Sequence, residues 1–442
     1  MHFQGSNSCN QHYYMWNQPG CAAFDIKEFL HTDICAKAGF GHDIIGKLEC
    51  NPVGYDGGLA VRYICKRPGM HKNGCAFQSH KGYGVPIGGV IAHETLVSPS
   101  GVGYDIGCGN KAVLTDADAA DVRTNIARIM DDVWSIISFG LARKNKELVD
   151  HELFDDNNDD GWQITQGANS AAWKLTCLRD MARAQLGTVG SGNHYVDIFE
   201  DEQSRIWVGV HFGSRGFGHK IATRFLNRAG AKDDMDSAPV ALDSRTQEGQ
   251  DYIAAMKLAG RYAYAGRDWV CDRVVKILSA RVLDSVHNHH NFAWRETHNG
   301  KDLWVVRKGA TPAFPGQKGF VGGTMGETSV ILEGIENEQS SLSLYSTVHG
   351  AGRVMGRMEA KGKRDKTGEW KRQPKVTQEM MDAWVKDAQV ELRGGGVDES
   401  PHCYKRLPEV LTEHAESVRV LHTLRPLGVA MAGREVYDPF KD

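Results

Sequence analysis

The sequence lacks the two features that mark a membrane or secreted protein. No apolar run is long enough to cross a bilayer. The N-terminal stretch MHFQGSNSCNQHYYMWNQPG has neither the basic segment nor the apolar segment of a secretion signal. These absences argue against a membrane-spanning helix and predict a cytoplasmic protein. Within this stretch, FQGSN resembles the remnant of an expression tag, so we leave it out of the fold prediction.

A strong net charge and closely paired cysteines are also missing. The 52 basic and 55 acidic residues leave a formal charge of −3, so no global basic field draws the chain to polyanions. Any nucleic-acid site must therefore be local. None of the ten cysteines belongs to a C-x-x-C pair, which argues against a treble-clef zinc site or a dithiol redox motif. In a reducing compartment we expect most of them to be small buried hydrophobes.

Hydrophobic periodicity predicts a mixture of helices and strands. The spacing predicts amphipathic helices over residues 116–141 and 248–286, and Thr377 is placed to cap another helix. Short β-type runs include YVDIF, RIWVGVHF, DLWVVRKG and SVILEG. Because helices and strands do not alternate regularly, we predict an α+β fold. We expect one large domain over residues 76–442, with mixed sheets around a deep pocket, peripheral helices, and residues 1–75 packed on it as an N-terminal extension.

Two charged stretches are typical of solvated loops. The acidic stretch HELFDDNNDDG covers residues 151–161, and the basic stretch AKGKRDKTGEWKRQPK covers residues 360–375. The basic stretch is also a place where RNA phosphates could bind.

Four turns, most of them rich in glycine, present side chains of the kinds that bind metals. A carboxylate, a thiolate and several imidazoles together suit Mn²⁺, Fe²⁺, Co²⁺ or Zn²⁺. Taken singly, each residue has an ordinary alternative role as core filler or as a satisfied strand residue. Four such turns in one chain favour a shared metal centre. They are GVGYDIGCGN with Asp105 and Cys108, GTVGSGNHYVD with Asn193 and His194, VGVHFGSRGFGH with His211, and SVHNHHNFA with His287, His289 and His290.

A second set of turns combines free backbone amides with a cation or a hydroxyl, as phosphate sites do. None fits the Walker A pattern or a strict G-x-G-x-x-G, so a nucleoside triphosphate would be held in an unusual way. In STVHGAGRVMGR, His349 could be a nucleophile, a metal ligand or a turn residue. The turns are Ser214-Arg215-Gly216, Arg307-Lys308-Gly309, Gly322-Gly323-Thr324-Met325-Gly326 and His349-Gly350-Ala351-Gly352-Arg353.

These turns and the segments between them resemble the RtcB family of GTP-dependent RNA ligases, from about residue 80 to residue 433. Ten stretches in the same order carry the resemblance, which makes it specific. They are HKGYGVPIGG, GVGYDIGCG, GTVGSGNHYVD, HFGSRGFGH, YIAAMKLAGRYAYAGR, HNFA, RKGATPAFP, GGTMGETS, HGAGRVMGR and RPLGVAMAG.

The resemblance implies a two-metal centre in which Cys108 would bridge two Mn²⁺ ions. Two cations would favour the thiolate over the thiol and share its charge. His290 is chosen from its run because it precedes an asparagine and an aromatic residue, as the family pattern requires. Its neighbours His287 and His289 would have supporting or surface roles. The other ligands would be Asp105 and His194 for one ion, and His211 with His290 for the other.

The resemblance also implies the reaction. His349 would attack the α-phosphate of GTP, release pyrophosphate and carry GMP. The GMP would pass to an RNA 3′-phosphate, and a 5′-hydroxyl end would displace it to join the two RNAs, in RNA repair or tRNA splicing. A 2′,3′-cyclic phosphate would first be opened by hydrolysis. Arg215 and Arg353 would make paired contacts to phosphate oxygens, while Lys308 and Arg357 would add charge, although Arg357 could equally form a surface ion pair.

Guanine recognition is expected from a carboxylate, because it accepts from the two donors on the guanine edge. Asp197 holds this place, where the family more often has Glu, and Met431 lies near a position that is often lysine. Gln78 replaces the usual Asp before His80. Since the metal and nucleophile positions are intact, these departures favour a divergent branch that still ligates. The other implied nucleotide contacts are Asn193, Thr324, Ser329, Tyr404, Gly350 and Gly352.

Two alternative functions stay open at this stage. One is a di-metal phosphoesterase that opens cyclic phosphates without ligation, and the other is a non-catalytic RNA-binding protein that keeps an inherited pocket. The preferred prediction is a cytoplasmic, monomeric RNA ligase that uses GTP and two Mn²⁺ ions. It would act on RNA with 3′-phosphate or 2′,3′-cyclic phosphate ends and 5′-hydroxyl ends, and it could use an archease-type activator.

Overall fold

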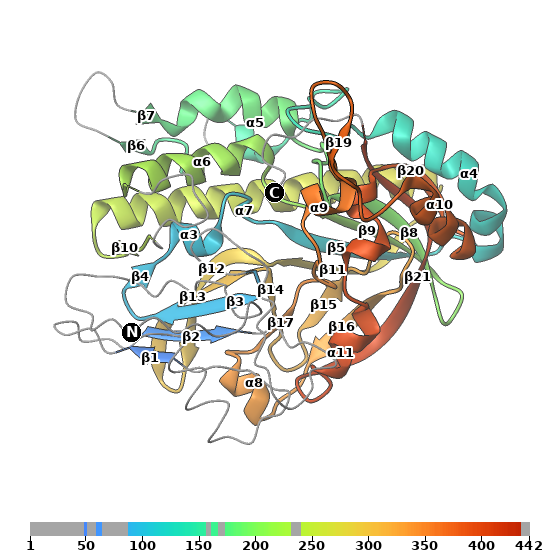
Figure 1. Cartoon of the computed structure of the whole chain (residues 1–442). Coiled ribbons are helices and arrows are strands. Elements are labelled where there is room, and N and C mark those ends of the chain that lie inside the picture. Colours follow the sequence, from blue (N-terminus) through green and yellow to red (C-terminus); the bar gives the residue numbers. More distant parts are fainter. Residues whose placement is uncertain are drawn as a thin grey trace.

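The computed structural model describes residues 48–50, 59–63, 87–155, 161–166, 173–230 and 240–434 (Figure 1). The predictions for Gln78 and His80, and for the tag-like N-terminal stretch, fall outside these residues. None of the described helices is long and apolar enough to cross a membrane.

An eight-stranded sheet forms the centre of the molecule. Its strand order is β11-β5-β9-β8-β21-β16-β15, with β20 paired parallel to β21. The edge strand β15 lies next to β11 at the other edge, so the sheet curls nearly into a barrel. The strands are β5 (Gly109–Thr115), β8 (Tyr195–Asp201), β9 (Ile206–Phe212), β11 (Val282–His289), β15 (Lys318–Val321), β16 (Ser329–Gly334), β20 (Glu391–Gly395) and β21 (Val418–Gly433).

Two amphipathic helices cover the outer face of this sheet. Helix α4 (Ala119–Ile136) begins where the Asp118 carboxylate accepts a hydrogen bond from the Asp121 backbone, and it packs on β20 and β21. Helix α7 (Gln247–Ile277) packs on β5 and β9. Alternate residues of β8, Val196 and Ile198, enter this apolar layer, while Tyr195 and Phe199 face the inside of the curled sheet.

The helix predicted over residues 116–141 is confirmed over Ala119–Ile136, where α4 ends at the extended Ile137. The prediction over residues 248–286 is wrong in its last part. Helix α7 ends at Ile277, and Ser279 then adopts a positive φ of 51°. From Val282 onwards the chain forms β11 and pairs with β5. The helical periodicity was overridden here because pairing with a central strand satisfies the backbone of this segment.

A second sheet of five strands packs beside the first, with the order β1-β2-β3-β13-β12. Strands β1 and β2 belong to the predicted N-terminal extension, and β2 pairs with β3 of the main body. Residues 64–86 lie outside the described ranges, so the predicted boundary between residues 75 and 76 stays a prediction. The strands are β1 (Leu48–Cys50), β2 (Leu59–Tyr63), β3 (Gly89–His93), β12 (Asn291–His298) and β13 (Lys301–Lys308).

The remaining elements surround these sheets. Two-stranded pairs are formed by β4 (Leu96–Val97) with β10 (Leu242–Asp243), β6 (Thr165–Gln166) with β7 (Trp173–Lys174), β14 (Ala310–Pro312) with β17 (Ser346–Val348), and β18 (Lys363–Arg364) with β19 (Trp370–Arg372). The helices are α3 (Pro99–Val102), α5 (Arg179–Gln185), α6 (Arg215–Arg228), α8 (Glu338–Leu342), α9 (Arg357–Lys361), α10 (Gln378–Asp387) and α11 (Leu407–Thr412). The part of the chain that the structure describes also contains the 3₁₀ turns η2 (Glu152–Phe154), η3 (Leu175–Leu178), η4 (Val397–Glu399) and η5 (Pro401–Cys403).

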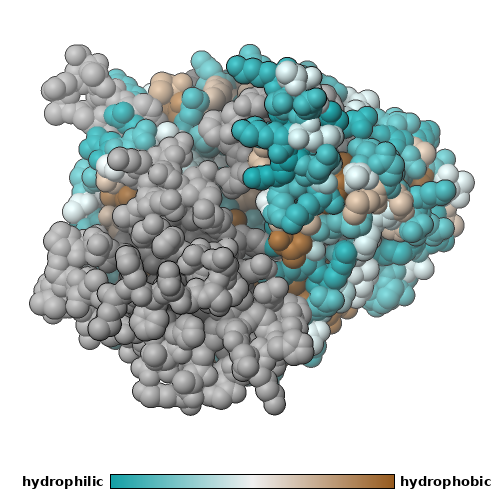
Figure 2. Space-filling model, viewed as in Figure 1, coloured by the Kyte–Doolittle hydropathy of each residue, from teal (hydrophilic) through white to brown (hydrophobic). Residues whose placement is uncertain are grey.

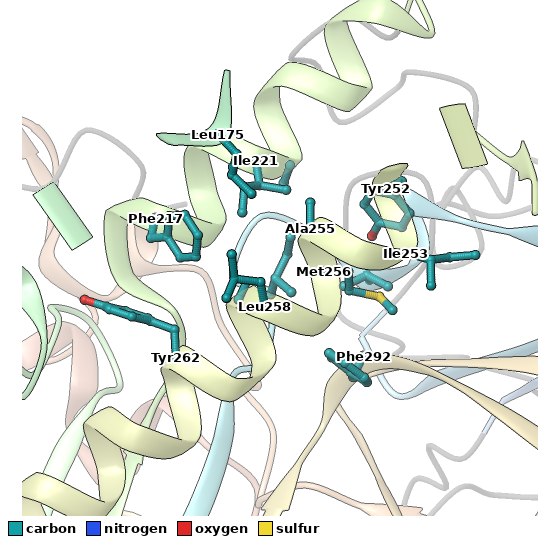
Figure 3. Close-up of a cluster of buried hydrophobic side chains, with 14 of the residues drawn as sticks. Leu175, Phe217, Ile221, Tyr252, Ile253, Ala255, Met256, Leu258, Tyr262 and Phe292 are labelled. Carbon is teal, nitrogen blue, oxygen red and sulfur yellow. The ribbon is translucent and has the colours of Figure 1, made fainter. Parts of the chain in front are cut away.

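The largest apolar core lies where α6 and α7 pack against each other (Figure 3). Phe217 and Ile221 of α6 meet Leu258 and Tyr262 of α7, and all four are buried. Phe292 of β12 closes the cluster from the second sheet. This core anchors the segments that precede β5 and follow β11, which carry several of the candidate ligands. With helices and mixed sheets in one body, the predicted α+β class is confirmed.

Candidate metal and nucleotide site

The candidate ligands come together because they lie at the same end of neighbouring antiparallel strands. Cys108 precedes β5, His194 precedes β8, His211 lies near the end of β9, and His290 follows β11. The register pairs Asn110 with His211, Tyr195 with His211, and His289 with Gly109. In antiparallel strands the start of one strand lies beside the end of its neighbour. Four turns that are far apart in the sequence therefore meet at the same end of the sheet.

Cys108 lies at the centre of this group. Its Sγ atom is 3.7 Å from His194 Nε2 and 3.5 Å from His211 Nε2. The ligand atoms of these three residues all lie within 4.8 Å of one another. The Asp105 Oδ2 atom lies 3.1 Å from His194 Nε2, which brings a carboxylate to the same place.

Two glycines make room for these ligands. A Cβ atom at Gly213 would lie 2.2 Å from a carboxylate oxygen of Asp105, and one at Gly190 would lie 2.1 Å from His194 Nδ1. Both contacts are far shorter than real Cβ contacts, so any side chain at these positions would displace a ligand. The glycine-rich turns noted in the sequence therefore serve close packing around the ligand side chains.

His290 and His349 extend the group in one direction. The ring centroid of His290 is 5.0 Å from that of His211 and 4.9 Å from that of His349. The His290 backbone N–H donates to the Cys108 carbonyl at 2.8 Å, which ties the two segments together. Within the described residues, the buried Nδ1 atoms of His194 and His290 have no hydrogen-bond partner.

His211 is oriented by Asn110, a residue that the sequence reading did not select. The Nδ1 atom of His211 lies 2.7 Å from Asn110 Oδ1, so Nδ1 carries the proton and Nε2 keeps its lone pair toward Cys108. The Asn110 amide also donates to the carbonyls of Phe320 and His349, at 2.8 and 3.3 Å. The sequence signal that could have identified Asn110 is its position two residues after Cys108, because alternate residues of a strand lie on the same face.

The ionisation of the group fits a metal site. Burial, and then the nearby Asp105 carboxylate, raise the pKa of the Cys108 thiol well above its usual value. Burial works against ionisation of Asp105 as well, but its hydrogen bonds to His194 and Cys108 outweigh this and lower its pKa. A buried thiol beside a carboxylate is a poor thiolate unless a cation offsets the charge. The donor set of one thiol, one carboxylate and several imidazoles fits a soft-to-intermediate divalent ion.

A buried arginine that the sequence reading missed holds the backbone behind these ligands. Arg267 of α7 is fully buried, and its guanidinium donates to the carbonyls of Gly107 and Phe212 at 2.9 and 2.5 Å. These residues directly precede Cys108 and follow His211. His287 and His289 also contact this guanidinium, at 2.8 and 3.0 Å, so both histidines are occupied here.

The imidazole of His349 packs against Gly309, whose φ is +61°. A Cβ atom at Gly309 would lie 3.1 Å from His349 Cε1. Burial lowers the pKa of His349 to about 4. A hydrogen bond with the Gly309 backbone raises this pKa, but by less than burial lowers it. The ring is therefore neutral near pH 7 and has a lone pair available.

The candidate phosphate-binding residues lie around this group, engaged with protein atoms. Arg353 donates to Glu399 Oε2 at 3.2 Å and to the hydroxyl of Tyr404 at 2.9 Å, and its guanidinium stacks on the Tyr404 ring. Arg357 forms a salt bridge with Glu399 and lies against Gly192, next to the exposed Asn193. Two further cations lie nearby, Arg215 with its Nη2 donating to the Gly140 carbonyl at 2.9 Å and Lys308 with its Nζ donating to the Ser100 carbonyl at 3.3 Å.

Asp197 lies on the inner face of the curled sheet beside Tyr195. It is 5% exposed, and its Oδ1 atom has no hydrogen-bond partner within the described residues, like the hydroxyl of Tyr195. Burial raises the pKa of Asp197 well above its usual value. The register places Val429 and Met431 of β21 on the same face. An unpaired carboxyl oxygen and an unpaired phenol in an apolar layer are costly, which favours a ligand that supplies hydrogen-bonding groups.

The other candidate nucleotide contacts lie in turns near this face. Ser329 Oγ accepts from the Gly323 backbone at 2.9 Å and so shapes the turn that carries Thr324. The hydroxyl of Thr324 lies 3.3 Å from Glu327 Oε2. Gly350 forms a β-bridge with Gly322, and Gly352 has a φ of +75°, which favours glycine.

The buried histidines predict a loss of stability in acid. Burial lowers the pKa of His287 to about 3 and that of His349 to about 4, whereas an unfolded histidine titrates near 6.5. Below pH 6.5 the unfolded state therefore binds more protons, so stability that is complete above pH 6.5 is lost as the pH falls toward 4. With these two groups, the free energy of unfolding should fall by roughly 3 kcal/mol per pH unit. Urea unfolding of metal-free protein measures this, and a constant free energy between pH 6.5 and 4 would contradict it.

Comparison with known proteins gives consistent matches over most of the chain. A family model described as tRNA-splicing ligase RtcB matches residues 61–432. The RNA-splicing ligase RtcB of Escherichia coli (strain K12) is 32% identical over 369 residues, covering 78% of this chain and 86% of that protein. The tRNA-splicing ligase RtcB of Thermococcus kodakarensis is 30% identical over 438 residues, covering 83% of this chain and 89% of that protein. That of Archaeoglobus fulgidus is 31% identical over 425 residues, covering 79% and 86%.

Proposed function

Since the chain belongs to the RtcB family and is an RNA ligase, we propose that it joins RNA 3′-phosphate or 2′,3′-cyclic phosphate ends to 5′-hydroxyl ends through a GMP carried on His349. The observation that carries the proposal is the position of a neutral histidine at the edge of a cluster of metal-type ligands. His349 lies next to His290 and is not needed to complete the group around Cys108.

Two Mn²⁺ ions are the metals that we propose for this centre. Asp105, Cys108 and His194 would hold one ion, and Cys108, His211 and His290 would hold the other. Bound divalent cations neutralise phosphate charge and favour the thiolate form of the cysteine. The support is the donor set, the short distances to Cys108 Sγ and the unpartnered Nδ1 atoms of His194 and His290.

The first step uses the lone pair of the neutral His349 imidazole. A ring nitrogen attacks the α-phosphorus of GTP, the bond between the α-phosphorus and the bridging oxygen breaks, and pyrophosphate leaves. The ring proton is then lost from the other nitrogen, for which the Gly309 backbone is a hydrogen-bonding neighbour. Because the pKa of His349 is about 4, no proton must be removed from the ring before the attack at pH 7.

The later steps transfer the GMP. An oxygen of the RNA 3′-phosphate attacks the phosphorus on His349, which frees the histidine and leaves a diphosphate link between RNA and guanosine. The 5′-hydroxyl of the second RNA then attacks the RNA 3′-phosphorus, loses its proton, and releases GMP. A cyclic phosphate must first gain a water, which opens the ring to a 3′-phosphate. We assign phosphate binding to Arg215, Lys308, Arg353 and Arg357, and ribose or phosphate binding to Asn193, Gly350 and Gly352.

We place the guanine base against Asp197, with Thr324, Ser329 and Tyr404 around the nucleotide. Donors on a bound base favour the ionised form of a buried carboxyl. The Asp197 carboxylate would then accept from the N1 and N2 donors of guanine, which adenine cannot offer in that arrangement. The support is its burial beside Tyr195 without a partner for Oδ1.

Asp197→Asn is expected to lower the efficiency of GMP transfer from GTP about 100-fold, because losing one partner of a buried charged hydrogen bond costs roughly 2–5 kcal/mol. Asp197→Glu keeps the carboxylate and is the matched control, for which we expect labelling by GTP to persist. The measurement is the rate of protein labelling with GTP and with ATP. Equal labelling by GTP in Asp197→Asn and in the unaltered protein would place the base elsewhere.

The experiment that tests the proposed function is labelling of the protein with α-labelled GTP and Mn²⁺. We expect acid-labile label on the protein, transfer of that label to RNA with a 3′-phosphate, and a joined product when a 5′-hydroxyl RNA is added. A protein that takes up no label but opens cyclic phosphates would be the di-metal phosphoesterase. A protein that does neither would be an RNA-binding relative without catalysis.

Finer points of organisation are also part of the proposal and rest on the family resemblance. We propose that residues 1–75 pack as an extension on a catalytic domain of residues 76–442. We also propose a cytoplasmic monomer that could use an archease-type activator. Light scattering tests the monomer, and ligation with and without the activator tests its need.

A further inference from the structure

A basic hairpin that contains β19 projects from the body of the protein (Figure 1). It comprises β18 and β19 with their flanking residues, 361–375, and we refer to it as the basic hairpin. It contains seven basic and two acidic residues in a chain whose formal charge is −3. From Lys363 to Arg372 every side chain is exposed, and Figure 2 shows a mainly hydrophilic surface in this region.

The acidic residues of the hairpin are fewer than its basic ones, and one of them, Asp365, is bonded within the turn. Asp365 accepts hydrogen bonds from the backbone of Thr367 and Glu369 and from the Thr367 hydroxyl, at 2.8, 3.1 and 2.6 Å. These bonds lower the pKa of Asp365 and commit it to the turn. Within the described residues, Lys363, Lys366 and Lys371 form no salt bridge, so these cations face solvent without a carboxylate.

The register of the hairpin keeps like charges together. Lys363 lies directly opposite Arg372, a pairing that destabilises a β-ladder. Glu359, the nearby carboxylate, forms its salt bridge with Lys375 and interacts more weakly with Arg372, so it offsets only part of this charge. Such an arrangement becomes favourable when an anion binds both cations, so the pair indicates a surface prepared for phosphates.

An exposed aromatic ring accompanies these cations. Trp370 is 37% exposed, and the guanidinium of Arg364 lies 3.9 Å above its ring. The stacked pair offers a flat surface among cations, which is how proteins hold single-stranded RNA without reading its sequence.

The root of the basic hairpin is tied to the candidate site. Ala360 and Val376, at its two ends, pack on Cys403, which precedes Tyr404. The Val376 backbone donates to the Ala360 carbonyl at 3.1 Å. Helix α9 then connects the hairpin to the loop that carries His349 and Arg353, and its first residue, Arg357, lies against Gly192. A strand of RNA that reaches His349 would therefore pass near the hairpin.

We propose that the basic hairpin binds the phosphate backbone of the substrate RNA beside its reacting 3′-phosphate end. The position of the hairpin beside the reacting RNA end rests on the proposed function, whereas its binding of RNA phosphates does not. Lys363, Lys366 and Lys371 supply the charge, and Trp370 with Arg364 supplies the stacking surface. Because the contacts are to backbone and base faces, they hold RNA of many sequences.

The test compares two triple variants in direct binding to a fluorescent single-stranded RNA with a 3′-phosphate. One carries Lys363→Ser, Lys366→Ser and Lys371→Ser. The matched control carries serine at three exposed lysines on α6 and α7, Lys220, Lys257 and Lys276. In the hairpin variant we expect roughly tenfold weaker binding. The slope of the logarithm of the binding constant against the logarithm of the salt concentration should be shallower by about two, because each lost phosphate contact reduces it by roughly 0.7. Labelling with GTP should be unchanged, because this step needs no RNA.

Two results would overturn the proposal. One is equal affinity and equal salt dependence in the hairpin variant and the control, and the other is a hairpin variant that loses GTP labelling together with RNA binding. Because the binding measurement needs no catalysis, it stands even if the unaltered protein forms no GMP adduct. Failure of the hairpin proposal and failure of the proposed reaction are therefore distinguishable.

Discussion

His349→Ala is expected to abolish transfer of GMP to the protein while leaving its metal content unchanged. Removing a nucleophile costs on the order of 10⁴-fold or more in rate, because the covalent intermediate can no longer form on it. In this structure His349 lies beside His290, whereas Cys108, His194 and His211 form the metal-type group without it. Labelling with α-labelled GTP and elemental analysis of the same samples measure the two effects.

This pair of measurements separates the three roles that the sequence left open for His349. If His349 is the nucleophile, the variant loses the label and keeps the metal. If it is a metal ligand, the variant loses both, and if it is a turn residue, the variant loses neither. The matched control is His151→Ala, a histidine that caps the turn η2 and belongs to no group of possible metal ligands in the described residues, so this variant should keep both label and metal. Label that persists in His349→Ala would reject the proposed mechanism.

Cys108→Ala is expected to have the second large effect, loss of the metal centre itself. Its Sγ atom is the common neighbour of His194 and His211, so its removal takes a ligand from both proposed ions. Mutating residues that merely support metal ligands costs about 10–100-fold in affinity, so losing the shared ligand should cost at least ~100-fold. Mn²⁺ titration followed by elemental analysis measures the loss, and GMP labelling should fall with it.

The matched control for Cys108 is another buried cysteine. Cys271 of α7 lies in the apolar layer between that helix and the sheet, where burial raises the pKa of its thiol to about 12. Cys271→Ala should keep Mn²⁺ binding and labelling, with only a modest loss of stability. If Cys108→Ala bound Mn²⁺ as tightly as the control, the thiol would not be a ligand.

Local sequence signals predicted elements best where packing agreed with them. The apolar spacing specified α4, and the strand-type runs specified β8 and β9. The same reasoning failed after Ile277, because β11 is held by its pairing with β5, a strand more than 160 residues earlier in the chain. A window along the sequence contains no information about such a partner.

The candidate site divides in the same way. The sequence identified the chemical types of Cys108, His194 and His211 from their glycine-rich turns, but Asn110, Arg267 and Tyr195 escaped notice. Asn110 matters because it sets the proton on His211, and Arg267 because it holds the backbone behind Cys108. Neither has a distinctive local motif, since the role of each depends on a partner distant in the sequence.

By itself, the sequence determined which side chains could carry the chemistry, the family to which they belong and the local elements that present them. Residue type and short spacing are properties of the chain, so they can be read without a fold. Only the tertiary structure decided that the four turns meet. Antiparallel pairing brings the starts of β5 and β8 to the ends of β9 and β11, and burial there sets the pKa of His349 and of Cys108. Distance, register and desolvation arise when the strands pair, and for that reason they could not be read from the turns alone.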